Sequence, residues 1–277
     1  MMKKIDLKML GITALVTGSV LAGSVSAFAE EGGEAGKIEK IYKSNAVIQF
    51  SPTGEGGGET TDPEEPIDPT DPTNPPVDPT DPTNPETGKP DPGTGGPLGI
   101  DFASSLRFGE QKITSTTQTY KVKPQEFTDR EDGPNYVQVT DNRGLVKGGW
   151  VLTLAQDGQF KTEAGEELTG AAISFDNGHV VTVSESENPD SFGTFTLGFD
   201  EAGKGVAQNL MVAGAEQGAG TFAFVFGDND SAASSITLTV PGKTKKIADN
   251  YATKLNWTLS DVPTGNEGEE SGSEGEE

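Results

Sequence analysis

Over residues 98–263, apolar and polar residues alternate in short runs that are separated by Gly, Pro, Asn and Asp. Alternation with period two is typical of β-strands that have one buried and one exposed face. No stretch keeps the 3.6-residue period of an amphipathic helix. The pattern predicts an all-β fold, a single β-sandwich or barrel-like domain of about ten short strands, over residues 97–263. The runs cover residues 100–108, 113–122, 136–139, 149–154, 171–175, 179–183, 194–199, 221–226, 236–240 and 251–259.

A two-residue turn signal separates two of these runs. Asn177-Gly178 follows residues 171–175 and precedes residues 179–183. Asn and Gly tolerate the positive φ angles that a type I′ turn requires. The sequence therefore predicts a β-hairpin with its turn at Asn177-Gly178.

The only two tryptophans occur in the same kind of tripeptide, Trp-x-Leu. Side chains two residues apart point to the same face of a strand, so Trp150 lies beside Leu152 and Trp257 lies beside Leu259. Two interpretations follow. The four residues are either anchors of one hydrophobic core or a paired ligand-binding feature, because an indole face offers a large apolar contact area.

The N-terminus has the three parts of a secretory signal peptide. Lys3, Lys4 and Lys8 are basic, an apolar stretch follows, and Ala27-Phe28-Ala29 forms a cleavage site. We expect residues 1–29 to be removed, which leaves an exported protein without a membrane span. Residues 30–52 form a short N-terminal segment with one predicted strand at residues 46–50.

Residues 53–96 are rich in Asp, Pro and Thr and contain a ten-residue repeat, at residues 68–77 and again at residues 78–87. Proline at this density favours extended polyproline II structure. At about 3.1 Å per residue, the proline-rich part could extend about 100 Å. The segment is expected to be an extended linker, either a spacer within a cell wall or a plain disordered tether.

The net charge is −24 for the whole chain. Residues 97–263 contain 22 acidic and 13 basic residues, a net charge of −9, and residues 264–277 form an acidic tail that we expect to be disordered. A negative surface disfavours nucleic acid and simple adsorption onto anionic lipid. The chain has no cysteine, which excludes disulfides and thiolate metal sites.

Residues that could carry out chemistry are few. His179 is the only histidine and has no nucleophile motif beside it. The Asp-rich turn at residues 227–231 is shorter than a complete calcium-binding loop. We therefore expect no catalytic site, no bound metal, no cofactor and no enzymatic activity. A basic cluster is either a solvated turn or a site for an anionic polymer or acidic partner; it consists of Lys243, Lys245, Lys246 and Lys254.

Three segments around the tripeptides carry further recognisable sequence. They are residues 97–113, with Leu-Arg-Phe-Gly-Glu-Gln-Lys-Ile, residues 139–150, with Asp-Asn-Arg-Gly, and residues 240–263, with Tyr-Ala-Thr-Lys-Leu-Asn-Trp-Thr-Leu-Ser-Asp-Val-Pro. Together with the signal peptide, the Asp-Pro-Thr repeats and the lack of a sortase-type sorting motif, they resemble the WxL-domain cell-surface proteins of Gram-positive bacteria. The resemblance covers roughly residues 40–263.

The resemblance implies a secreted protein that is attached non-covalently to the cell wall, with peptidoglycan as the usual ligand. It also implies partnership with other WxL proteins and with membrane-anchored companion proteins. Adhesion to host extracellular matrix is a role of some members. The alternative is a protein-interaction or host-matrix adhesin module that partner proteins hold at the surface.

Overall fold

The computed structural model describes residues 64–143 and 148–263. These residues form 14 β-strands and no helix, and the neighbouring strands are antiparallel. The all-β prediction is confirmed, and the sheets form an open sandwich rather than closing on themselves. The predicted signal peptide, the strand at residues 46–50 and the acidic tail lie outside the described residues. In the described part, the structure has no helix that is long and apolar enough to cross a membrane.

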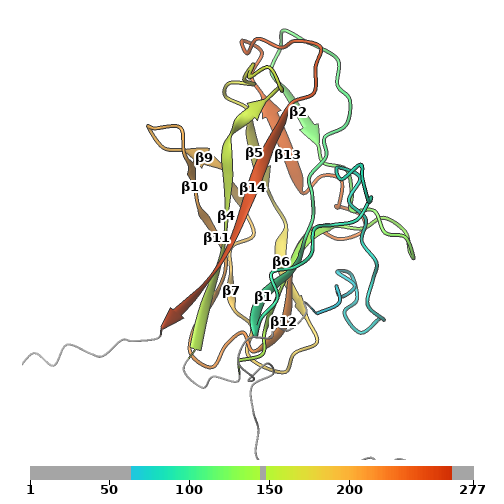
Figure 1. Cartoon of the computed structure of the whole chain (residues 1–277), viewed down its shortest axis with the longest axis vertical. Coiled ribbons are helices and arrows are strands. Elements are labelled where there is room, and N and C mark those ends of the chain that lie inside the picture. The colour runs from blue at the N-terminus through green and yellow to red at the C-terminus, as the bar shows by residue number, and fades with distance from the viewer. Residues whose placement is uncertain (1–63, 144–147, 264–277) are drawn as a thin grey trace, which may run out of the picture. The chain divides into compact units, whose positions relative to one another are not determined.

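Two four-stranded sheets form the two layers of the sandwich (Figure 1). The first contains, in spatial order, β1 (Leu98–Ala103), β3 (Asn135–Asp141), β12 (Gly220–Phe226) and β6 (Gly178–Thr182). The second contains β14 (Ala252–Pro263), β4 (Gly148–Lys161), β11 (Gln208–Ala213) and β7 (Asp190–Ser191). Strands β1 and β14 are each the end strand of their sheet. They lie on the same side of the sandwich, because they contact each other.

The remaining strands extend this arrangement beyond one end of the first sheet. A third sheet contains β2 (Gln118–Lys121), β13 (Ile236–Val240), β5 (Ala172–Phe175) and β8 (Phe195–Thr196). A two-stranded ribbon pairs β9 (Gly198–Phe199) with β10 (Gly205–Val206).

The predicted hairpin at Asn177-Gly178 is wrong. Strand β5 pairs with β13 and β8, whereas β6 pairs with β12, so the two strands that flank the dipeptide belong to different sheets. Asn177 has φ 57°, but Gly178 is not among the residues with positive φ, and a type I′ turn needs both. A Cβ atom on Gly178 would lie 2.7 Å from the Cα atom of Gly193. The glycine thus permits a close approach of two backbones where the chain passes from one sheet to the next.

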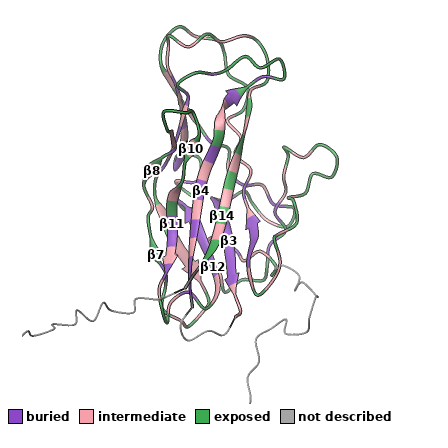
Figure 2. Ribbon diagram, turned by 60° about the vertical axis from the view of Figure 1, so that its left-hand side comes forward, coloured by how far each residue is buried: buried purple, intermediate pink, exposed green. Residues whose placement is uncertain are grey.

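The main core lies between the two layers and contains side chains from both. Strand β4 contributes Trp150, Leu152 and Leu154, each with 0% exposure, and they pack with Phe222 and Phe224 of β12. Buried residues alternate with less buried ones along β4, whereas most of β14 has only intermediate or exposed positions (Figure 2). The period-two pattern of the sequence therefore locates the core correctly on β4.

Residues 64–96, here called the strap, pack against the outer face of the first sheet (Figure 1). Ile67 and Val77 contact a second apolar cluster that includes Phe102 and Tyr136. The backbone N–H of Ile67 donates to Oε1 of the buried Gln138 at 2.7 Å. Polar side chains on the outer face of the first sheet therefore hold the backbone of residues 64–96, the described part of the expected linker.

An ion pair fixes the first Asp-Pro-Thr repeat. Asp68 is buried and pairs with Arg130, and it also accepts hydrogen bonds from Asn74 Nδ2 at 2.9 Å and from the N–H of Thr70 at 2.8 Å. Burial by itself would raise the pKa of Asp68, but these hydrogen bonds lower it well below its usual range. The carboxylate therefore stays charged and holds the repeat in one conformation.

Candidate functional site

A groove of about 800 Å³ opens between β1 and β14, on the side of the sandwich where both strands are end strands. The strap forms the third wall. Core side chains such as Phe160 and Ile173 lie at its base, and its rim combines aromatic and charged residues. The principal rim residues are Asp81, Asp91, Phe108, Tyr251, Lys254 and Trp257.

Hydrogen bonds hold the strap wall in place. Asp81 accepts from Ser105 Oγ at 2.8 Å with one carboxylate oxygen, and from the N–H and hydroxyl of Thr83 with the other. The N–H of Thr94 donates to the carbonyl of Ile100 at 2.8 Å, and the N–H of Ile100 donates to Thr94 Oγ1 at 2.9 Å. The strap is thus a structural part of the groove.

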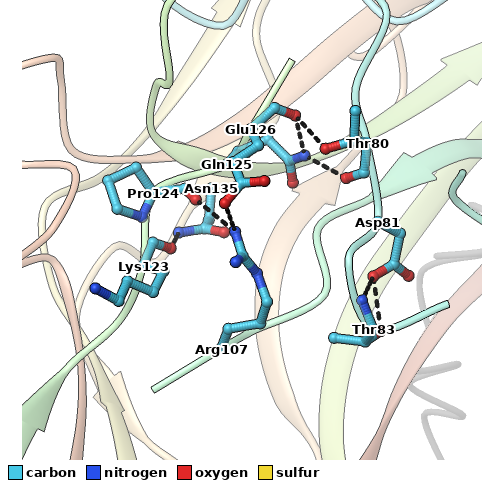
Figure 3. Close-up of polar contacts among 9 residues, drawn as sticks. All are labelled: Thr80, Asp81, Thr83, Arg107, Lys123, Pro124, Gln125, Glu126 and Asn135. Carbon is cyan, nitrogen blue, oxygen red and sulfur yellow. Dashed lines mark hydrogen bonds and ion pairs between the residues drawn. The ribbon is translucent and has the colours of Figure 1, made fainter. Parts of the chain in front are cut away.

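Figure 3 shows how the chain behind the strap is braced. The side chain of Gln125 donates to the carbonyl of Thr80 at 2.7 Å, and the N–H of Thr80 donates to the carbonyl of Glu126 at 2.9 Å (Figure 3). Arg107 donates to Glu126 Oε1 at 2.9 Å and to the carbonyl of Pro124 at 3.3 Å. These contacts fix the position of residue 80, directly before the groove carboxylate Asp81.

A buried carboxyl group forms part of the β1 wall. Asp101 lines the groove and accepts hydrogen bonds from Thr140 Oγ1 at 2.7 Å, from Gln138 Nε2 at 3.0 Å and from the N–H of Glu64 at 3.0 Å. Burial raises the pKa of this carboxyl above its usual range, although all three donors oppose the shift. Asp101 therefore joins the beginning of the strap to the first sheet.

The two Trp-x-Leu tripeptides lie on neighbouring strands. In the pairing of β14 with β4, Leu259 faces Leu152, Trp257 faces Leu154, and Asp261 faces Trp150. The two tryptophans are therefore about four residues, or roughly 14 Å, apart along the strands. The register brings together two motifs that are more than a hundred residues apart in the sequence.

The two tryptophans have different environments. Trp150 has 0% exposure, and its Nε1–H donates to the carbonyl of Gly218 at 3.0 Å. Trp257 is partly buried, packs against the main core from β14 and lines the groove. Leu152 is buried beside Trp150, and Leu259 is partly buried and lies outside the groove lining. A role in ligand contact stays a prediction for all four residues, and of the four only Trp257 lines the groove.

Arg143 fixes the end of β14 that lies farthest from the groove. Its guanidinium donates to both carboxylate oxygens of Asp141, at 2.9 and 2.8 Å, and to Asp261 at 2.6 Å. The hydrogen bonds to Asp141 are the main cause of a raised pKa for Arg143. This contact between β14 and the loop after β3 could not be read from the sequence, because it depends on the strand register.

Two of the other candidates lie together, because His179 and the Asp-rich turn with Asp228 and Asp230 line a second, smaller cavity of about 250 Å³. His179 is exposed on β6. Within residues 64–143 and 148–263, no group of three His, Cys, Asp or Glu side chains is arranged to hold a metal ion. The basic cluster is partly neutralised, because Lys245 pairs with Glu166 at 2.9 Å and Lys246 donates to two backbone carbonyls.

Comparison with known proteins gives one clear result. A family model described as "WxL domain surface cell wall-binding" matches residues 37–263, which is most of the chain. The match includes the strap as well as both layers of the sandwich. No curated protein and no solved structure matches the chain.

Proposed function

The chain belongs to the WxL family of surface cell wall-binding domains, and from this premise we propose that its wall ligand is peptidoglycan, bound in the groove beside Trp257. Cell-wall binding is the property of the family. Beyond this family property, we propose three things: that the polymer is peptidoglycan, that the signal peptide directs export, and that the protein has no catalytic activity.

The observation that carries the proposal is the position of Trp257. Its side chain is held from behind by the main core and lines an open groove. Aromatic side chains with one packed and one accessible side provide large, rigid contact surfaces at low entropic cost. Tyr251 and Phe108 also line the groove, and Asn256 and Thr253 add polar groups to the lining, although the hydroxyl of Thr253 already donates to the carbonyl of Gly158 at 2.9 Å. Such a groove suits a sugar ring with hydroxyl and acetamido substituents.

The net charge favours local recognition over general attraction. The domain is acidic, so simple adsorption onto anionic wall polymers is disfavoured. A neutral sugar ring against an indole does not meet this repulsion. This supports a binding site in the groove for a domain with a net charge of −9 over residues 97–263.

Sedimentation with purified peptidoglycan tests the proposal. We expect Trp257→Ala to weaken binding at least about tenfold, which corresponds to about 1.4 kcal/mol. Phe192→Ala is the matched control, because Phe192 is an exposed aromatic residue outside the groove lining. Far-UV circular dichroism must show that both variants are folded. Equal binding by parent and Trp257→Ala would exclude the groove as the site.

Association with other WxL proteins, with membrane-anchored companions or with host matrix stays a prediction. The alternative function, a protein-interaction module retained by partners, predicts retention on whole cells and no binding to protein-free peptidoglycan. The same sedimentation assay therefore separates the two functions.

A further inference from the structure

The groove exposes the edge of a strand rather than one of its faces. Residues 252–257 of β14 are consecutive, and all of them line the groove. Neighbouring side chains point to opposite faces of a strand, so one face cannot supply six consecutive lining residues. The backbone edge of β14 must therefore face the groove, with the N–H and C=O groups of alternate residues, those that do not bond to β4, directed into it.

This edge has no strand beside it in the described part of the chain. Strand β14 is the end strand of its sheet and pairs only with β4. The opposite wall is different, because Thr94 hydrogen-bonds to both the N–H and the C=O of Ile100 on β1. Unpaired strand edges bind extended peptides by adding them to the sheet. The groove thus has one open edge, on β14, and one covered edge, on β1.

The charges on the two walls have opposite signs. Lys254 is exposed on the β14 wall, while Asp91 is exposed on the strap wall, which also contributes the hydrogen-bonded carboxylate of Asp81. An extended ligand that carries both a carboxylate and an ammonium group matches these walls. A glycan strand carries no ammonium group, whereas the stem peptides of peptidoglycan carry free carboxylates and amines.

We propose that the open edge of β14 binds the stem peptide of peptidoglycan in an extended conformation, and this rests on the function proposed above. The peptide backbone pairs with the edge at residues 252–257. Its carboxylate lies towards Lys254 and its side-chain ammonium lies towards Asp91 and Asp81. The strap then determines which stem peptides bind, which gives the Asp-Pro-Thr repeat region a role in recognition.

Two forms of peptidoglycan test the proposal with the intact protein. One form is untreated, and the other has been digested with an amidase that removes the stem peptides from the glycan strands. We expect the affinity for the digested form to be at least about tenfold lower. Equal affinity for both forms would overturn the peptide assignment and leave the proposed function intact. Binding to neither form would overturn the proposed function itself.

Synthetic stem peptides test the charge assignment. Acetylation of the side-chain amine is expected to weaken binding roughly fivefold, the scale of one exposed ion pair. Asp91→Asn should reduce this difference, because only Asp81 then remains to face the ammonium group, whereas the control Asp190→Asn, at an exposed carboxylate on β7, should retain it in full. If the parent binds both peptides equally, the charge assignment is wrong. If an unrelated extended peptide of equal charge binds as tightly, the edge is a general protein-docking site and the assignment to stem peptides is wrong.

Discussion

Replacement of each tryptophan by alanine should affect stability very differently, although both belong to the same sequence motif. Trp150 is fully buried, and Trp→Ala changes in a core cost about 3–5 kcal/mol. The change also removes the donor to the buried carbonyl of Gly218, which adds about 1 kcal/mol or more. A total of about 4–6 kcal/mol is a large part of the roughly 5–15 kcal/mol that stabilises a typical domain. Trp257 is only partly buried on an end strand, so Trp257→Ala should cost about 1–2 kcal/mol.

Urea denaturation followed by far-UV circular dichroism measures this difference without relying on tryptophan fluorescence. Trp150→Ala should shift the midpoint strongly to lower urea or leave the domain unfolded, while Trp257→Ala should shift it slightly. Trp150→Phe is a useful intermediate, because it keeps an aromatic ring and removes the N–H donor. If the two alanine variants lose similar stability, the assignment of Trp150 to the core and Trp257 to the groove is wrong.

Three further changes test contacts that the structure shows. Gly218→Ala should destabilise the domain by about 1–3 kcal/mol in urea denaturation, because Gly218 has φ 72° and an added Cβ would lie 2.8 Å from Nε1 of Trp150. Gly203→Ala is the control for φ alone, because Gly203 has φ 78° and an added Cβ there meets open space. Asp68→Asn should lower the free energy of unfolding by about 2 kcal/mol at pH 7. Because the pKa of Asp68 is lowered in the folded state, the parent should lose this stability as pH falls below about 4, and the variant should not. Parallel curves of stability against pH for the two proteins would contradict the account. Arg143→Ala leaves Asp141 unpaired and should increase amide hydrogen exchange at the end of β14, near Asp261, more than near Lys254; uniform exchange would refute the local role of Arg143.

Residue alternation predicts the fold class and much of the core from the sequence. Trp150, Leu152 and Leu154 share one face of β4, and all three are buried. This works because a half-buried strand needs its apolar residues at period two. The same rule does not predict the degree of burial on β14. There Trp257 and Leu259 follow the alternation but stay partly exposed, because β14 is an end strand. Position within a sheet depends on long-range pairing that local sequence does not contain.

The strap shows a second limit. Its composition predicts an extended linker, and composition gives no sign that Gln138 and Asp101 hold residues 64–96 on the sheet. These two polar residues lie within runs that predict a strand with a solvated face, and the strap covers that face. The groove was missed for the same reason, since its walls come from the strap, β1 and β14. Asn177-Gly178 was misread because its turn signal also suits a passage between sheets, and local sequence does not distinguish the two.

Fluorescence of Trp257 during titration with soluble peptidoglycan fragments tests the central claim most directly. Trp150 is buried, so an external quencher such as acrylamide reports mainly on Trp257. If the fragments bind in the groove, quenching of the parent's fluorescence by acrylamide should decrease as the fragments saturate the protein. Trp257→Phe should show neither this quenching nor a decrease of it on fragment binding. Saturable binding that leaves the quenching of Trp257 unchanged would place the wall-binding site elsewhere on the domain.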